Sequence, residues 1–378
     1  MKYLLLLAIL SIVFPSSKWL SSSRRTNVAL FVSALPLQHT PRNIILLIGD
    51  GMGIAQITAA IYAQAEQLNL ERFPITGLMK THSAKHRVTD SAAGATAFAC
   101  GCKTYNGAIG VDLHKKPCRT ILEEAAAAGM ATGLVATSSI THATPAAFIA
   151  HVSKRSEMEE IAPFFLKTRI DLLIGGGLSY FNRRSDGRDL CRELQEKGFD
   201  VYTFQQHSLN ECQLNPTRPF AWFSADKEPD GVHEGRNYLP LAARIAPTFL
   251  AQRSPRGFFL MIEGSQIDWA CHRNNSEHVV KEMLDFDKAV GEALRFAEQD
   301  KNTLVVVTAD HETGGMALLR GNDKKELKIK FSTLHHTASL VPVFAYGPGA
   351  EIFSGVYDNT DLHAKMKAFL KLDAVEMR

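Results

Sequence analysis

Short apolar runs recur along the chain, and most lie next to a stretch with the spacing of an amphipathic helix. Residues 43–48 (NIILLI) are apolar and rich in β-branched side chains, which is typical of a strand buried on both faces of a parallel sheet. A Gly-Asp-Gly-Met-Gly turn follows, and helical spacing then continues to about Gln67. Further strands are predicted at 130–136, 171–174, 257–262, 303–308 and 341–346, and further helices at 120–128, 157–167, 239–251, 276–299 and 361–370. This alternation predicts one doubly wound α/β domain with helices on both faces of its sheet.

Two segments depart from the alternation. Residues 178–238 are rich in Arg, Asn, Cys and Pro, and we expect an irregular peripheral excursion there rather than a second domain. Residues 1–38 contain an apolar run over 3–14, which is too short to span a bilayer comfortably and matches the apolar part of a secretory signal. A retained N-terminal anchor is the alternative. We therefore expect one domain over 39–378, with no membrane-spanning segment inside it, in a periplasmic or secreted protein.

Composition narrows the choice of partners. The chain has 378 residues and a formal net charge of +3, which is too balanced to favour nucleic-acid or membrane-surface binding. Its six cysteines contain no CxxC pair, so neither a zinc ribbon nor a dithiol redox motif is indicated. In an exported protein they could pair, and Cys191 with Cys212 is the pairing we favour. Cys100 is expected to be a buried thiol.

Residues 88–97 (VTDSAAGATA) read as a loop that turns into a helix at a serine. Thr89 or Asp90 can cap that helix, and Gly101 can end it after a run of small residues. The Ser91 hydroxyl would then lie at a helix N-terminus, where the N–H groups and the macrodipole favour negative charge. For an isolated serine, simple helix capping would be the better interpretation.

Acidic and histidine side chains follow several of the predicted strands. Because ligands bind beyond the carboxyl ends of parallel strands, these side chains are expected at one edge of the sheet. Asp268 and His272 are four positions apart, which places both on one face of a helical turn in a spacing that suits one zinc ion. Like charges gathered at one edge are unfavourable unless cations hold them. The residues concerned are Asp50, Glu263, Asp268, His272, Asp310 and His311.

Other polar positions are ambiguous on spacing alone. His142 and Thr144 follow the second predicted strand, in a Thr-His-Ala-Thr-Pro sequence that can begin a helix. Arg155 lies in a short basic cluster, for which a solvated surface is the simpler interpretation. His336 is one of two adjacent histidines, and spacing does not decide between them.

Six motifs together resemble the alkaline phosphatases, in the order of that family. They are IGDGMG, TDSAAGATA, THATPAAFIAHVSKR, IEGSQIDWACH, TADHETGG and HHT. The resemblance implies an α/β/α sandwich around a large, mostly parallel sheet. It also implies that Ser91 is the nucleophile and that Arg155 binds the substrate phosphate. The implied activity is hydrolysis of phosphate monoesters through a phosphoserine at alkaline pH.

The resemblance further implies two Zn²⁺ and one Mg²⁺. Asp268, His272 and His336 would hold one zinc, and Asp50, Asp310 and His311 the second. Asp50 would also bridge to the third metal, with Thr144 and Glu263. His142 stands beside that third site, where the best-known enterobacterial enzyme has an aspartate. A nitrogen donor there also suits Zn²⁺ or Co²⁺.

Two further features bear on assembly and activity. Only about two dozen residues separate Thr313 from His335, where many relatives carry a long insertion that helps form a dimer, so either a monomer or a homodimer is expected.

The rival activities are those of a phosphodiesterase or a sulfatase. The sequence around Ser91 lacks the C/S-x-P-x-R context of a sulfatase. A non-catalytic exported metal- or phosphate-binding protein is the alternative from another class.

Overall fold

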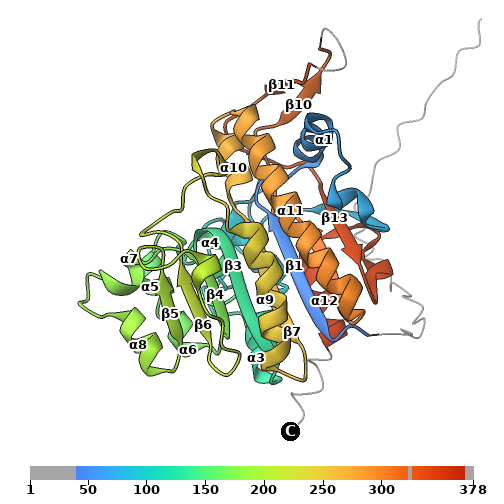
Figure 1. Cartoon of the computed structure of the whole chain (residues 1–378). Helices are drawn as coiled ribbons and strands as arrows, with labels where there is room; N and C mark the ends of the chain where they lie inside the picture. Colours follow the sequence, from blue (N-terminus) through green and yellow to red (C-terminus); the bar gives the residue numbers. More distant parts are fainter. Residues whose placement is uncertain (1–39, 322–325, 371–378) are drawn as a thin grey trace, which may run out of the picture. The chain divides into compact units, whose positions relative to one another are not determined.

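The computed structural model describes residues 40–321 and 326–370, and a ten-stranded sheet runs through this part of the chain (Figure 1). In spatial order the strands are β14 (Gly355–Asp358), β2 (Ile75–Lys80), β13 (Val341–Tyr346), β8 (Thr303–Thr308), β1 (Asn43–Gly49), β7 (Phe258–Gly264), β3 (Ala131–Ser139), β4 (Leu172–Gly176), β6 (Phe220–Phe223) and β5 (Asp200–Thr203). Among these strands β13 alone is antiparallel to its neighbours. The predicted α/β class and mostly parallel sheet are confirmed.

The centre of the sheet is fully buried, which explains the continuous apolar runs. All seven residues of β1 are buried, and β1 pairs with β7 on one side and β8 on the other. In this register Leu46 lies opposite Met261 and Val306, so three aliphatic strands pack side by side. A strand covered on both faces cannot alternate apolar and polar residues, because both faces need apolar side chains.

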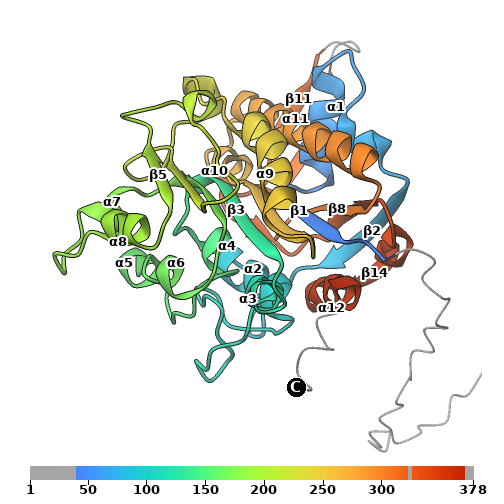
Figure 2. The same ribbon diagram turned by 60° about the horizontal axis from the view of Figure 1, so that its bottom comes forward.

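Helices cover both faces of the sheet (Figure 2). One face carries α1 (Ile54–Ala63), α9 (Leu239–Arg253), α10 (Gln266–His272) and α11 (Ser276–Asp300), and the other carries α2 (Ser91–Cys100), α3 (Ile121–Ala127), α4 (Ala143–Ala146) and α12 (Asn359–Leu370). The longest of them, α11, buries Val279, Met283 and Val290 at helical spacing. Asn275 caps this helix by accepting a hydrogen bond from the His278 N–H.

Several predicted boundaries are wrong for identifiable reasons. The helix expected over 157–167 is divided into α5 (Met158–Ile161) and α6 (Phe164–Lys167), because Pro163 between them has no N–H to continue the hydrogen-bond ladder. The first helix stops at Ala63 rather than near Gln67. The remaining short elements are η1 (Asn69–Arg72), η2 (Leu209–Glu211), η3 (Val232–Glu234), η4 (Ala350–Phe353), β9 (Glu312–Thr313), β10 (Met316–Leu319), β11 (Lys328–Phe331) and β12 (His336–Thr337).

The prediction of irregular structure over 178–238 is also wrong. This segment contains α7 (Ser179–Asn182), α8 (Leu190–Glu196) and the strands β5 and β6. Both strands are parallel additions to the edge of the main sheet, where β6 pairs with β4. Each strand has only four residues, which is too short for periodicity to distinguish it from a loop.

The favoured disulfide is not formed, and all six cysteines are free thiols in the described part of the chain. Cys191 and Cys212 each pack against the apolar core, and the Cys212 thiol donates to the Ser208 carbonyl oxygen. Cys100 is half-buried rather than fully buried.

The expected signal or anchor over residues 1–38 lies outside the described residues, which begin at Thr40. Within the described ranges, every helix is too short or too polar to cross a membrane.

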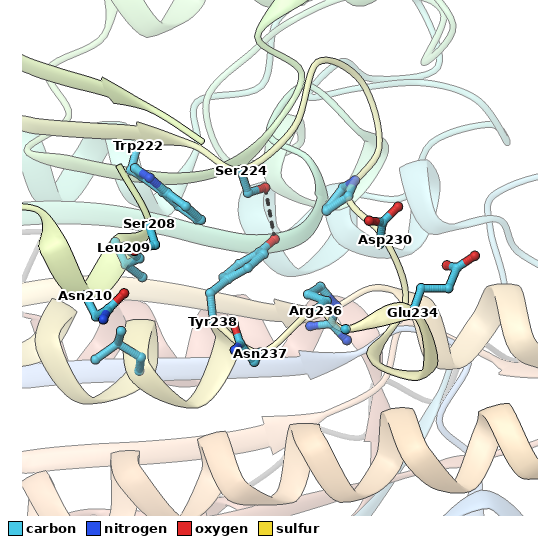
Figure 3. Close-up of a pocket in the computed structure, with 13 residues that line it drawn as sticks. Ser208, Leu209, Asn210, Trp222, Ser224, Asp230, Glu234, Arg236, Asn237 and Tyr238 are labelled. Carbon is cyan, nitrogen blue, oxygen red and sulfur yellow. Dashed lines mark hydrogen bonds between the residues drawn. The ribbon is translucent and has the colours of Figure 1, made fainter. Parts of the chain in front are cut away.

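A buried ion network ties the segment before α9 to α11. Figure 3 shows Arg236 on this segment, beside a cavity lined by Trp222 and Tyr238. Arg236 donates to Glu282 and, at 3.0 Å, to Asp285, and all three side chains are almost fully buried. Burial raises the pKa of Asp285 to about 6, although Arg236 opposes this shift. The guanidinium is therefore the compensating charge for two carboxyl groups that have little access to water.

Replacing Arg236 should be strongly destabilising, because it leaves these two acids buried without their cation. We expect Arg236→Ala to lower the free energy of unfolding by about 3–5 kcal/mol, measured by urea denaturation. Arg192→Ala is the matched control, because Arg192 forms an exposed pair with Glu196. That control should be indistinguishable from the parent chain. Equal stability of Arg236→Ala and the parent would contradict this account of the network.

Candidate active site

The three central strands deliver acidic side chains to one rim of the sheet. Asp50 follows β1, Glu263 lies near the end of β7, and Asp310 and His311 follow β8. Because β1 lies between β7 and β8 and all three are parallel, their carboxyl ends meet at this rim. All four side chains are fully buried. The sequence-based expectation that these residues share one edge of the sheet therefore agrees with the observed arrangement.

Ser91 begins the helix that faces this rim. Asp90 is the N-cap of α2, and its carboxylate accepts the Ala93 N–H at 3.0 Å, while Gly101 ends the helix in a left-handed conformation (φ 67°). The Ser91 Oγ lies 3.3 Å from His311 Nε2. The same imidazole nitrogen lies 3.2 Å from Asp310 Oδ2 and 3.5 Å from Asp50 Oδ1. The serine hydroxyl thus lies at a helix N-terminus and next to the acidic rim.

A second group of ligand-type atoms surrounds Asp268 on α10. Its two carboxylate oxygens lie 3.3 Å from His272 Nε2 and 3.4 Å from His336 Nε2. The two imidazole nitrogens are themselves 3.0 Å apart. His336 also stacks on His311 with ring centroids 3.5 Å apart, whereas His335 is exposed. Of the two adjacent histidines, His336 is therefore the one that lies at the site.

The donor atoms fit bound cations. Asp268, His272 and His336 hold one ligand atom each within 4.8 Å of one another, and so do Asp50, Asp268 and His311. Both carboxylate oxygens of Asp50 and one of Asp310 are buried without a hydrogen-bond partner among the described residues. Mixed imidazole nitrogen and carboxylate oxygen donors are typical of zinc sites. Buried oxygens without a partner in the protein can serve as ligands for a cation.

Oxygen donors predominate beside Asp50 on the β7 side. Asp50 N–H donates to the Gly264 carbonyl oxygen at 3.1 Å, which places Asp50 next to Glu263. Glu263 Oε1 and the Thr144 hydroxyl are both buried without a partner among the described residues. Such a hard oxygen set suits Mg²⁺. His142 lies next to Arg155, with its Nε2 3.3 Å from the guanidinium, and its Nδ1 is buried without a hydrogen-bond partner among the described residues.

Burial and mutual repulsion perturb the acids of the rim. Burial, with the charges of Asp310, Asp268 and Glu263, raises the pKa of Asp50 well above its usual value. Burial raises the pKa of Glu263 to about 7 and that of Asp310 to about 6. Burial would also raise the pKa of Asp268, but the bond to His272 and the nearby histidines hold it below its usual range. Burial, followed by the charge of His336, lowers the pKa of His311. Without cations, part of this rim is therefore protonated near neutral pH.

Arg155 points to the site rather than to bulk solvent. Its Nη1 donates to Asp90 Oδ2 at 3.1 Å, and that same oxygen accepts the Gly107 N–H at 2.9 Å. Asp90 therefore caps the helix with one oxygen and orients Arg155 with the other. The interpretation of Arg155 as part of a solvated basic surface is not supported by this geometry.

Comparisons with known proteins agree with this arrangement. The family model described as alkaline phosphatase matches residues 41–329 and 320–372. The chain belongs to the alkaline phosphatase family. Alkaline phosphatase 4 of Bacillus subtilis (strain 168) is 34% identical over 85% of this chain and 87% of its own length. The Escherichia coli (strain K12) alkaline phosphatase is also 34% identical, over 88% of this chain and 86% of its own.

Solved alkaline phosphatase structures share the fold. The enzyme of the Antarctic bacterium TAB5 is 45% identical, with a TM-score of 0.84 over 88% of this chain and 98% of that one. A variant of the TAB5 enzyme with one histidine replaced by aspartate holds magnesium in its M3 site, and it matches with 44% identity and a TM-score of 0.83 over 88% of this chain and 99% of that one. The α/β/α sandwich implied by the motifs is confirmed by these likenesses.

Sequence reasoning missed Thr313. Its hydroxyl donates to Asp268 Oδ1 at 2.5 Å and lies 3.1 Å from His311 Nδ1. Thr313 therefore connects the group around Asp268, which contains His272 and His336, to His311 at the rim. Its position in the sequence could have indicated a role at the site, because Thr313 lies two residues after His311 in the TADHETGG motif. A bond to Nδ1 leaves Nε2 of His311 directed at the rim, which fixes the orientation of the ring.

A third group of possible ligands was also not anticipated. His233, His278 and Glu282 each place one ligand atom within 4.8 Å of the others, away from the family motifs. Glu282 already accepts bonds from His278, the Val232 N–H and Arg236. Its carboxylate is therefore satisfied within the protein, and we assign this group to the buried ion network described above.

The raised pKa of Glu263 predicts how the metal-free protein responds to pH. In the unfolded chain Glu263 loses its proton near pH 4.5, whereas in the folded chain it keeps it until about pH 7. This carboxyl group therefore favours folding at low pH, and that contribution is lost as pH rises from about 4.5 to 7. We expect Glu263→Gln to gain stability relative to the parent over this window, on the order of 3 kcal/mol, in denaturation measured with a chelator present.

The comparison of variant and parent is needed because His142 and His311 have lowered pKa values and act in the opposite direction. Repeating the titration with excess Zn²⁺ and Mg²⁺ is the control, and the pH-dependent gain should disappear there. A constant stability difference between Glu263→Gln and the parent at all pH values in the chelator would show that Glu263 is not protonated in the metal-free fold.

Proposed function

We propose that this chain hydrolyses phosphate monoesters to an alcohol and inorganic phosphate at alkaline pH, through a phosphoserine at Ser91. One observation carries the proposal: the Ser91 hydroxyl lies 3.3 Å from His311 Nε2, within a rim of buried acids and imidazoles. Membership of the alkaline phosphatase family supports the same class of reaction.

The residues at the rim fit two Zn²⁺ and one Mg²⁺. Asp50, Asp310 and His311 would hold one zinc, Asp268, His272 and His336 the other, and Asp50, Thr144 and Glu263 the magnesium. His142 lies beside the third set, for which Zn²⁺ and Co²⁺ are the alternatives. When bound, such cations supply positive charge that stabilises deprotonated oxygen atoms of nucleophile, water and leaving group.

The protein groups around Ser91 suit phosphoryl transfer. The Ser91 oxygen forms a bond to phosphorus as the bond to the substrate alcohol breaks, and water later releases phosphate from the serine. The N-terminus of α2, through its helix macrodipole, favours the negative oxygens of the transferring group. Arg155, oriented by Asp90, offers a planar fork to two phosphate oxygens. Because the serine must lose its proton, the rate should rise with pH.

The substrates we propose are small-molecule phosphate monoesters. The Streptomyces griseus streptomycin-6-phosphate phosphatase, 33% identical over 88% of this chain and 91% of its own, is an example of a relative named for such a substrate. We further propose export to the periplasm or beyond, as the apolar run near the N-terminus predicts, and activity as a monomer or homodimer.

Replacing the nucleophile tests the proposal directly. We expect Ser91→Ala to form no phosphoenzyme and to lose about 1000-fold or more in kcat, because no other hydroxyl replaces Ser91 Oγ. The measurement is acid quenching with a ³²P-labelled monoester, followed by peptide mapping. Rates on a monoester and a diester of the same nitrophenol, measured on the parent chain, test the substrate class.

Ser138 provides a matched control, because its hydroxyl is buried and contacts Glu263 at 3.3 Å but lies on β3. Ser138→Ala should still form the phosphoenzyme. A labelled phosphoenzyme in Ser91→Ala would show that the nucleophile is misassigned, and a preference for the diester would overturn the substrate class.

Arg155 should affect phosphate binding and not the cations. We expect Arg155→Ala to raise the inhibition constant of inorganic phosphate by about 10- to 100-fold, because two charge-assisted hydrogen bonds are lost. Arg155→Lys retains the charge but not the planar fork, and its effect should be intermediate. Zinc content, measured by elemental analysis, should be unchanged in both variants. Loss of zinc from Arg155→Ala would show that this role for Arg155 is wrong.

A further inference from the structure

Three cysteines lie at the C-terminal end of the helix that begins with Ser91. Cys100 is the last residue of α2, and the left-handed Gly101 then turns the chain so that Cys102 follows. Cys118 returns to the same place, two residues before Thr120 caps α3. The Sγ atoms of Cys102 and Cys118 are 3.1 Å apart. This pair lies outside the site described above.

The backbone around the pair is held by hydrogen bonds on both sides. The Gly101 N–H donates to the Ala97 carbonyl oxygen at 3.0 Å, and the Cys118 N–H donates to the Gly110 carbonyl oxygen at 2.9 Å. The sulfurs therefore meet because two fixed backbone segments bring them together. A disulfide needs the sulfurs about 1 Å closer, at roughly 2.05 Å, which is a shift within reach of side-chain rotation.

We propose that Cys102 and Cys118 form a disulfide that closes the segment between them. Both side chains are half-buried, so that a small oxidant can reach them. Among the other cysteines, Cys212 donates to a backbone oxygen and Cys271 accepts from Gln56. The Cys100 thiol donates to the Cys118 carbonyl oxygen at 3.3 Å and also bonds to Cys102, so Cys100 is the competing partner that the experiment below must exclude.

The chemistry is thiol–disulfide exchange with an external disulfide, either a protein oxidant or a small molecule such as oxidised glutathione. One thiolate attacks the oxidant and forms a mixed disulfide, and the second thiolate then displaces the remaining half. The two cysteines lose two protons and two electrons, and the oxidant leaves as two thiols. A hydrogen bond from Cys100, with a further one from Cys118, lowers the pKa of Cys102 to about 7, against the effect of burial. Cys102 is therefore suited to make the first attack.

The closed segment touches the residues next to Ser91. Gly107, within the ring, donates its N–H to Asp90 Oδ2 at 2.9 Å and accepts the Arg155 N–H at 2.8 Å. The Gly110 N–H donates to the Thr96 hydroxyl at 3.1 Å. A disulfide across this segment would restrict its freedom in the unfolded chain and stabilise the part of the fold that positions Asp90 and Arg155.

Peptide mapping of the full chain tests the proposal. The protein is treated with oxidised glutathione, blocked with iodoacetamide under denaturing conditions and digested without reduction. We expect a cross-link between Cys102 and Cys118, and four of the six thiols should be alkylated. Cys100 and Cys102 share one tryptic peptide, because no Lys or Arg separates them, so the map is repeated with Cys100→Ala. The cross-link should persist in that variant and disappear in Cys102→Ser and in Cys118→Ser.

Thermal unfolding gives a second readout. Reducing the oxidised parent should lower its Tm by about 5 °C, because the ring between the two cysteines is opened. Cys212→Ser, the control at another half-buried cysteine, should show the same shift, whereas Cys102→Ser and Cys118→Ser should show none. A cross-link through Cys100, or no cross-link with six alkylated thiols, would overturn the proposal even if the phosphatase activity is intact.

Discussion

The arrangement of the site depends on the concentration of negative charge at a buried rim. Three adjacent parallel strands end at the same edge, and each brings a carboxyl group to a place with no access to water. The protein supplies few hydrogen-bond donors there, and oxygen atoms of Asp50, Asp310 and Glu263 are left without partners among the described residues. Such a rim is stable in two ways: its acids keep their protons, or cations bind the charged oxygen atoms. The raised pKa values of these acids follow from the same burial and mutual repulsion.

Small residues let the remaining groups approach the rim. A Cβ at Gly94 in α2 would lie 3.2 Å from Asp310 Cβ, so the helix that begins with Ser91 packs closely against the acidic turn. Gly51, after β1, has φ +76°, and a Cβ there would lie 2.8 Å from Asp268 Cα. A larger residue at either position would separate α2, which begins with Ser91, or α10 from the carboxylates. The small-residue character of residues 92–97 is therefore a packing requirement of the site as well as a helix signal.

The sequence predicted the parts of the fold in which local pattern and tertiary burial agree. The strands β1, β8 and β13 were placed to within one residue, because a strand buried on both faces must be continuously apolar. The short edge strands β5 and β6 were missed because four residues carry no usable period. Asp50, Glu263, Asp310 and His311 could be grouped because strand ends converge. Arg155 and His336 could not, since a turn and a return of the chain bring them to the rim, and only the resemblance to a family placed them there.

The route by which His336 reaches the site also bears on the short connection after Thr313. His336 pairs with Thr313 in the two-residue ladder between β12 and β9, and the Gly314 N–H donates to the His335 carbonyl oxygen at 3.0 Å. This ladder sets His336 beside Asp268 and His311, and Thr313 bonds to both of these residues. One ladder therefore places a candidate ligand at the site and also links the group around Asp268 to His311. A longer insertion between these strands is not needed to build the site, because the geometry of the rim is already determined where the chain leaves β9 and re-enters at β12.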